Sequence, residues 1–394
     1  MSDPAASHDH TVHEAVGPAL PPVEAGVALA LGVNGLLVLG PLPVLLGDLA
    51  DTHRLTAAGI GQAATVELLA MGVATGLAAI VIKPERLKAL GVLICIVLAA
   101  IDIACVWTGG AAIMAMRAAA GVAEGLLLWM TVGMIARTVT PERWAGVFFT
   151  AQVLAQLALS VACASWIMPR WGANGGFVAL ALVSLAMAAG AIFGPGRYAP
   201  LPKPEGESGS PPPRGWIALL ATLVYVSAGG AIGVYLQPLA EQAGLGAGVA
   251  RTAVSVSLAA QVAGAALATA LAGRVRYFTI FLITSAVSLA VWYAFALRIP
   301  GWLFIAANAA AGLTALLLGP FLVPMTIEAD PSRRAAVQSG GAQLLGGALG
   351  PWLASLLVGD RDVHAVLWLG AGLMLPALAV VAWLHYSSRR VPVT

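Results

Sequence analysis

Charge is scarce in this chain of 394 residues, because Asp, Glu, Lys and Arg together make up only 10% of it, whereas 60% is hydrophobic. Soluble globular domains carry about 25% charged residues. The deficit excludes an ordinary soluble protein. It predicts an integral membrane protein, and we expect an all-α one.

Cysteine is equally rare, and all three cysteines lie in apolar runs, which predicts small buried side chains rather than a disulfide framework. The first 21 residues contain neither Lys nor Arg, so we expect no secretory signal peptide there. His8, His10 and His13 in this segment could bind a metal ion. We favour a disordered cytoplasmic tail over residues 1–21.

The sequence also lacks the common catalytic motifs. It has no phosphate-binding Gly-x-x-x-x-Gly-Lys-Ser/Thr, no His-Glu-x-x-His and no Gly-x-Ser-x-Gly. The methionines inside apolar runs have no metal-ligand spacing with histidine. We therefore expect no enzyme, no cofactor, no metal site and no nucleic-acid partner.

Apolar runs of about 20 residues, the length that crosses a bilayer, occur twelve times. The predicted spans are Val23–Leu49, Thr56–Ile82, Leu87–Trp107, Gly109–Ala136, Arg143–Met168, Gly175–Phe193, Gly215–Ala240, Gly248–Ala272, Tyr277–Leu297, Gly301–Ile327, Arg334–Val358 and Val363–Tyr386.

A proline-rich segment divides the spans into two sets of six. Its composition predicts a solvated linker over residues 194–214, between a first bundle at 22–193 and a second at 215–388. Residues 389–394 form a short cytoplasmic tail. With both termini in the cytoplasm, 14 of the 20 Lys and Arg residues lie on that side and five lie outside, which agrees with the positive-inside rule.

The two halves repeat each other at an offset of 190 residues. Pro141, Arg143, Ala145 and Val147 after the fourth span match the residues at 331, 333, 335 and 337 after the tenth. Parallel six-helix repeats are the architecture of one large class of transporters.

Arg117-x-x-x-Gly121-x-x-x-Gly125 on the fourth span resembles a motif of the major facilitator superfamily, whose arginine is linked to proton coupling in many members. The six-plus-six spans, the proline-rich middle segment and the basic loops after spans two and eight are similar to that family's twelve-span bacterial type. The loop motif after span two is badly eroded, since residues 83–88 keep charge but not the glycines.

The resemblance implies two six-helix bundles related by a pseudo-twofold axis, in the inner (cytoplasmic) membrane. It further implies alternating access of a small-molecule substrate, with protons and membrane lipid as partners, and we expect a monomer. The antiporters of the family carry Gly-x-x-x-Gly-Pro on span five. Here that pattern is Gly346-x-x-x-Gly350-Pro351 on span eleven, either a relocated flexible element or, as we favour, a contact between helices.

Four ionisable residues inside predicted spans, all in the first half, are the candidates for proton coupling: Glu67, Asp102, Arg117 and Glu124. A charge at bilayer depth costs roughly 2.5–3.5 kcal/mol, so such residues face a partner or a watery cavity. Our hypothesis is that Arg117 pairs alternately with Glu67 and Glu124, and that the released carboxylate takes up a proton. The alternative is a structural ion network. Asp102 lies near an outer helix end and either joins this group or reaches interfacial water.

No buried charge is expected in the second half, where neutral polar and aromatic groups replace it. By the resemblance, spans one, four, seven and ten line a central cavity. The candidate substrate-binding residues are then Asn34, Trp129, Tyr225, Tyr235, Gln237 and Asn308.

This set suits a neutral or singly charged organic molecule, since a multiply anionic one would need more than one buried cation. A flippase or exporter of lipids or amphiphiles on the same fold, a membrane-embedded enzyme, and a non-transporting membrane sensor are the alternatives.

Overall fold

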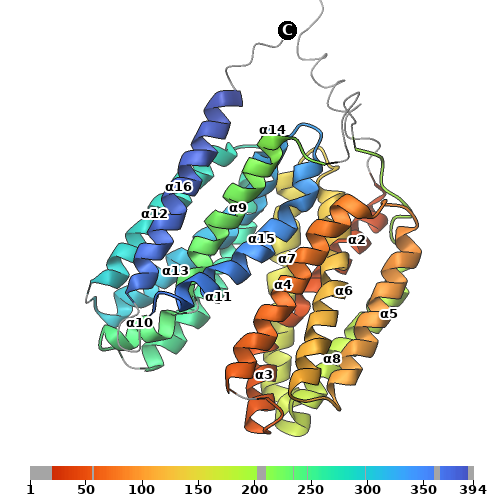
Figure 1. The fold of residues 1–394 in the computed structure, drawn as a ribbon, viewed down its shortest axis with the longest axis horizontal. Helices are drawn as coiled ribbons and strands as arrows, with labels where there is room; N and C mark the ends of the chain where they lie inside the picture. Colours follow the sequence, from red (N-terminus) through yellow and green to blue (C-terminus); the bar gives the residue numbers. More distant parts are fainter. Residues whose placement is uncertain are drawn as a thin grey trace, which may run out of the picture. The chain divides into compact units, whose positions relative to one another are not determined.

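The computed structural model describes residues 20–55, 57–201, 210–233, 235–245, 247–297, 299–358 and 364–388. Residues 1–19 of the predicted first tail, the predicted tail at 389–394 and residues 202–209 of the proline-rich segment lie outside these ranges. All named elements in the described part are helices (Figure 1). In the first half they are α2 (Pro22–Leu36), η1 (Leu37–Leu39), α3 (Leu42–Asp51), α4 (Ala57–Val81), α5 (Leu87–Cys105), α6 (Ala111–Ile135), α7 (Pro141–Ala162), η2 (Cys163–Ile167) and α8 (Met168–Ala191).

The second half contains α9 (Pro213–Gly233), α10 (Leu236–Gln242), α11 (Ala247–Leu271), α12 (Tyr277–Ala296), α13 (Gly301–Leu318), η3 (Gly319–Phe321), α14 (Leu322–Ala329), α15 (Arg334–Ser355) and α16 (Ala365–Ser388). Prolines and glycines explain the interruptions. Pro41 follows η1 where α2 gives way to α3, and Pro320 lies in η3 between α13 and α14, because proline cannot donate the backbone hydrogen bond that an α-helix needs.

Ten stretches of the described chain are long and apolar enough to cross a membrane. One of them, Pro141–Ala191, has 51 residues, which is enough for two crossings, and the left-handed backbone of Gly172 (φ 58°) interrupts its helical geometry. Helix α15 is less apolar, because it is rich in glycine and glutamine, and it is not among the ten. Counting the divided stretch as two and adding α15 gives the twelve spans that the sequence predicts. The protein is an all-α, multi-pass membrane protein.

The predicted repeat is confirmed in the helix boundaries. Helices α11, α12 and α13 begin 190 residues after α4, α5 and α6 respectively. The packing repeats as well, since α4 lies along α6 and α5 along α8, just as α11 lies along α13 and α12 along α16 (Figure 1). The two halves therefore repeat each other in helix position and in these helix pairings.

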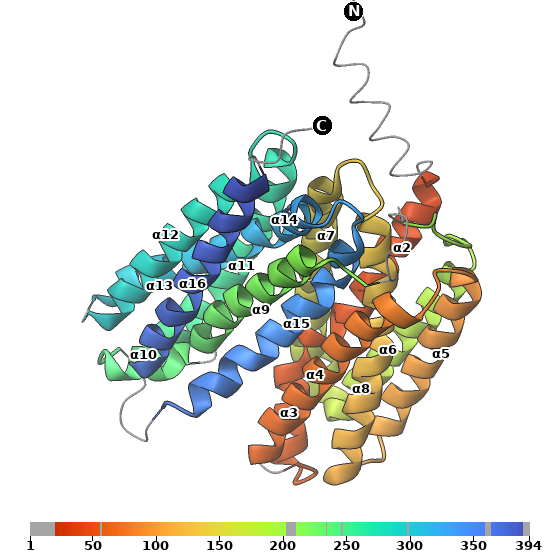
Figure 2. The same cartoon turned by 45° about the horizontal axis from the view of Figure 1, so that its top comes forward.

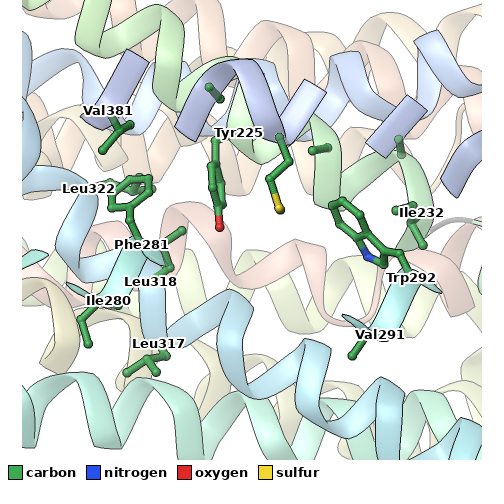
Figure 3. Packing of buried hydrophobic residues seen from close by; sticks show 14 of the residues in the cluster. Tyr225, Ile232, Ile280, Phe281, Val291, Trp292, Leu317, Leu318, Leu322 and Val381 are labelled. Carbon is green, nitrogen blue, oxygen red and sulfur yellow. The ribbon is translucent and has the colours of Figure 1, made fainter. Parts of the chain in front are cut away.

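The chain forms two compact units, and each has its own core. The first unit comprises residues 1–139, 151–210 and 332–341, and the second comprises 140–150, 211–331 and 342–394. Helices α9 and α16 lie side by side in the second unit in both views (Figure 2). Its core is aromatic around Tyr225 of α9 and Phe281 of α12, whose rings meet edge to face at 5.2 Å (Figure 3).

The beginning of the proline-rich segment is packed rather than solvated, which differs from our expectation. Tyr198 is only 6% exposed, and its hydroxyl donates a hydrogen bond of 2.9 Å to the carbonyl of Met130 on α6. Arg137 donates to the carbonyl of Ala199, and its guanidinium lies 5.5 Å from the Tyr198 ring. Burial lowers the pKa of Arg137 to about 10 and raises that of Tyr198. The aromatic ring thus attaches this segment to the end of α6.

The three cysteines are free and buried, as the sequence predicts.

Candidate functional site

Two glycines of the Arg117 motif bring α6 close to α4. A Cβ atom on Gly121 would collide with the carbonyl oxygen of Glu67, and one on Gly125 would collide with that of Met71. Glycine at such positions lets two membrane helices approach closely. Because Arg117 lies one turn before Gly121 on the same face of α6, this approach places its guanidinium beside the side chain of Glu67.

The guanidinium of Arg117 contacts carboxylates from three helices. Nε donates to Oε2 of Glu67 on α4 at 3.0 Å, and Nη2 donates to the other oxygen of the same carboxylate. Nη1 donates to Oδ1 of Asp102 on α5 at 2.9 Å. Nη2 also reaches Oε1 of Glu124 on α6 at 3.3 Å. Phe177 of α8 covers the guanidinium, with its ring centre 5.8 Å from Cζ.

All four charged residues are buried. Glu67 and Arg117 have 0% of their surface exposed, Glu124 has 2% and Asp102 has 3%. Glu124 is the least firmly held of the acids, because its Oε1 contact is the longest and its Oε2 is buried with no hydrogen-bond partner in the described part. We call these four residues the Arg117 cluster.

The Arg117 cluster holds three acids but one base, so it would carry an excess of two negative charges if every acid were ionised. Moving an uncompensated charge out of water costs several kcal/mol. Protonation of two of the three carboxylates would remove this excess negative charge. The arrangement is therefore suited to bind and release protons.

The sequence predicts the meeting of Arg117 with Glu67 and Glu124, and the structure shows both contacts at the same time. It also decides between our two interpretations of Asp102, which is buried against the guanidinium rather than placed in interfacial water. The contact between Asp102 and Arg117 could not be predicted by counting residue depth along each helix separately. Helix α5 packs along α6, so that a residue near the end of one helix lies beside the start of the other.

Two of the predicted substrate residues lie inside the first unit. Asn34 on α2 donates to the hydroxyl of Ser184 on α8 at 3.3 Å, and its side chain is 5% exposed. Trp129 on α6 is buried, with 3% exposed. Asn34 thus makes a hydrogen bond between helices, and Trp129 is packed inside the unit.

Two others line a cavity of about 370 Å³ in the second unit. Tyr225 presents its hydroxyl there, within 2.9 Å of the Ser285 hydroxyl. Asn308 uses one amide hydrogen to bond the carbonyl of Ala253 at 2.8 Å. Tyr235 packs against the core next to α10 and is not among the lining residues. Gln237 belongs to α10, but its side chain lies outside the described part.

The expectation of no buried charge in the second half is wrong, because Asp330 is only 1% exposed and Arg334, at the start of α15, is only 7% exposed. A buried histidine adds to them. His385, in the last turn of α16, is buried, with its Nδ1 3.3 Å from a carboxylate oxygen of Glu328 on α14 and 3.1 Å from the hydroxyl of Tyr277. The ring of Phe278 stacks on the imidazole at 4.6 Å. A histidine followed by tyrosine at the end of an apolar run was the available signal, and its position at the end of the span concealed its burial.

No group of three or more His, Cys, Asp or Glu side chains in the described chain is placed to hold a metal ion. The acids of the Arg117 cluster instead surround a guanidinium.

Two six-helix repeats that span a membrane are the architecture found in one large class of membrane transporters. Comparison with known proteins specifies the fold further, although no family model and no curated protein matches the sequence. The chain has the fold of the major facilitator superfamily transporters.

It is similar to the crystal structure of the transporter FucP in the outward conformation, with a TM-score of 0.73 and 13% identity over 91% of this chain and 98% of that one. It is also similar to the human organic anion transporter MFSD10, with a TM-score of 0.68 and 15% identity over 92% of this chain and 100% of that one. A second structure of FucP, the E. coli fucose:proton symporter, matches with a TM-score of 0.68 and 13% identity over 92% of this chain and 98% of that one.

Proposed function

We propose that this protein is a proton-coupled secondary transporter that moves a small organic solute across the cytoplasmic membrane by alternating access. One observation carries the proposal, namely that a single buried guanidinium is shared by Glu67, Asp102 and Glu124. The fold supports it, as do the names of the similar structures, a fucose:proton symporter and an organic anion transporter. The distribution of basic residues favours cytoplasmic termini.

Glu124 is the acid that exchanges its proton in this proposal. It has the longest contact with Arg117 and an unpaired oxygen, so neutralising it disturbs the fewest hydrogen bonds. When Glu124 is neutral, the guanidinium is held by Glu67 of α4 and Asp102 of α5. When it is ionised, it competes for the nitrogen that it shares with Glu67. The proton therefore alters how strongly α4 and α6 are joined.

One proton per cycle is a sufficient driving force for such a transporter. A charge that crosses 100 mV of membrane potential releases about 2.3 kcal/mol, and each 1.4 kcal/mol is worth a factor of ten, so one proton could support roughly 40-fold accumulation.

The test uses the purified full chain in liposomes that contain a pH-sensitive dye. A panel of organic solutes is added outside, and we expect some of them to produce a proton flux that depends on the solute. Glu67→Gln and Glu124→Gln should abolish this proton movement while exchange of labelled solute for unlabelled solute continues. Glu24→Gln is the matched control, because it makes the same substitution in the first turn of α2, outside the Arg117 cluster. Proton flux that is unchanged in both cluster variants would contradict the proposal.

A flippase or exporter of amphiphiles is the second candidate. The observation that favours it is the cavity of the second unit, whose lining is mostly apolar. Movement of a fluorescent lipid analogue between the leaflets of the same liposomes, without a proton requirement, would select this candidate.

A further inference from the structure

Three of the glycines that border the cavity of the second unit have open space where a side chain would begin. Within the described part, a Cβ atom on Gly229 or Gly233 of α9, or on Gly347 of α15, would have no heavy atom within 4 Å. Gly229 and Gly233 are one turn apart, so they lie on the same face of α9. Gly229 and Gly233 therefore serve no close contact between helices, whereas the carbonyl oxygen of Gly347 lies 3.4 Å from the position of a Cβ atom on Gly230.

Neighbouring glycines on α15 show what a packing glycine looks like in this unit. A Cβ atom on Gly346 would collide with the backbone of α9 at Leu223, and one on Gly350 would collide with it at Ser227. This confirms that the Gly346-x-x-x-Gly350 pattern makes a helix contact. Glycine destabilises a helix relative to alanine, so glycines without a packing role need another reason. Gly229 and Gly233 also border the cavity, which the equally open Gly372 of α16 does not.

Polar groups with unused hydrogen-bonding capacity line the same cavity. Gln261 of α11 and Gln343 of α15 make no hydrogen bond within the described part of the chain. Gln343 and Gly347 are one turn apart on one face of α15, so α15 contributes both an amide and an open space. Trp292 adds an aromatic side chain from α12 (Figure 3).

No Asp, Glu, Lys, Arg or His side chain belongs to the described lining of this cavity, which is mostly apolar. An ion that enters such a site loses water and gains no opposite charge. An uncharged molecule loses much less, and its hydrogen-bonding groups can be satisfied by the free amides of Gln261 and Gln343.

We propose that the cavity bounded by Gly229, Gly233 and Gly347 binds an uncharged, mainly apolar organic molecule that carries hydrogen-bonding groups, such as an aromatic alcohol or amide. The glycines of α9 keep the space open for it, and Gln261 and Gln343 bind its polar groups. We identify this molecule with the transported solute, and this identification rests on the function proposed above. Binding itself needs no proton gradient and is tested separately.

The experiment measures equilibrium binding to the full chain in lipid nanodiscs, with empty nanodiscs correcting for partition into lipid. The probes share one ring system and differ in charge: 1-naphthylmethanol and 1-naphthamide are neutral, 1-naphthoate is an anion and 1-naphthylmethylammonium is a cation. We expect saturable binding of a neutral probe and at least about tenfold weaker binding of both ions.

Gly229→Leu projects an isobutyl group into the open space without a backbone collision, and it should weaken binding of the neutral probe by at least about tenfold. Gly372→Leu on α16 is the matched control, because that glycine also has open space around it but does not line the cavity. Unfolding temperatures of both variants show that they are folded.

Three results would overturn the inference: no saturable binding of either neutral probe, equal affinity for a charged probe, or unchanged affinity in Gly229→Leu. A proton-coupled flux of a charged solute, combined with no binding here, would leave the proposed function in place and remove only this inference. Binding of a neutral probe without any proton coupling would support this inference and contradict the proposed proton-coupled function.

Discussion

Replacing Arg117 with methionine is the sharpest test of the charge balance in the cluster. Methionine keeps much of the length of the side chain but leaves Glu67, Asp102 and Glu124 buried without a cation. Removing one partner of a buried ion pair costs about 3–5 kcal/mol. Glu67→Gln leaves the guanidinium bound to two acids, and the amide can still accept a hydrogen bond, so we expect a cost of about 1–2 kcal/mol.

These costs are measurable as unfolding temperatures of the purified protein in detergent, followed by tryptophan fluorescence. Using about 2–4 °C per kcal/mol, we expect Arg117→Met to lower the midpoint by roughly 6–20 °C and Glu67→Gln by about 2–8 °C. The double variant should be more stable than Arg117→Met alone, because it has one acid fewer to neutralise.

The pH dependence gives a second readout. Without Arg117, the folded state must hold protons on its buried acids, whereas the unfolded chain releases them near neutral pH. The folded state then binds more protons than the unfolded state, so the stability of Arg117→Met should fall as pH rises. Equal midpoints for Arg117→Met and Glu67→Gln, with no difference in pH dependence, would refute the charge count.

Three further substitutions, two of them paired with a control, test contacts of α6 and α15 by the same thermal assay. Gly121→Val should destabilise strongly, by about 1–3 kcal/mol, because it forces α6 away from α4, whereas Gly26→Val meets open space and should cost little. On α15, Gly350→Ala should lower the midpoint because it collides with the backbone of α9, while Gly347→Ala should leave it unchanged or raise it. Tyr198→Phe removes one buried hydrogen bond to α6 and should cost about 1 kcal/mol; no change in the midpoint would show that the segment is not held there.

Local properties of the sequence were enough to predict the membrane class, the twelve spans, the repeat at 190 residues and the presence of charges at bilayer depth. Each depends on composition or on the length of one segment. The pairing of Arg117 with Glu67 was also predictable, because their depths along neighbouring spans agree.

The tertiary structure decided what depends on how helices rotate and approach one another. It brought Asp102 of α5 to the same guanidinium, buried His385 against Glu328, and left Gly229 facing open space while Gly350 packs tightly. A helix sequence shows which residues share a face, but the neighbour that this face meets is selected by close packing along the whole helix. For this reason the pair Gly346 and Gly350 packs against another helix, whereas the pair Gly229 and Gly233, with the same spacing, borders a cavity.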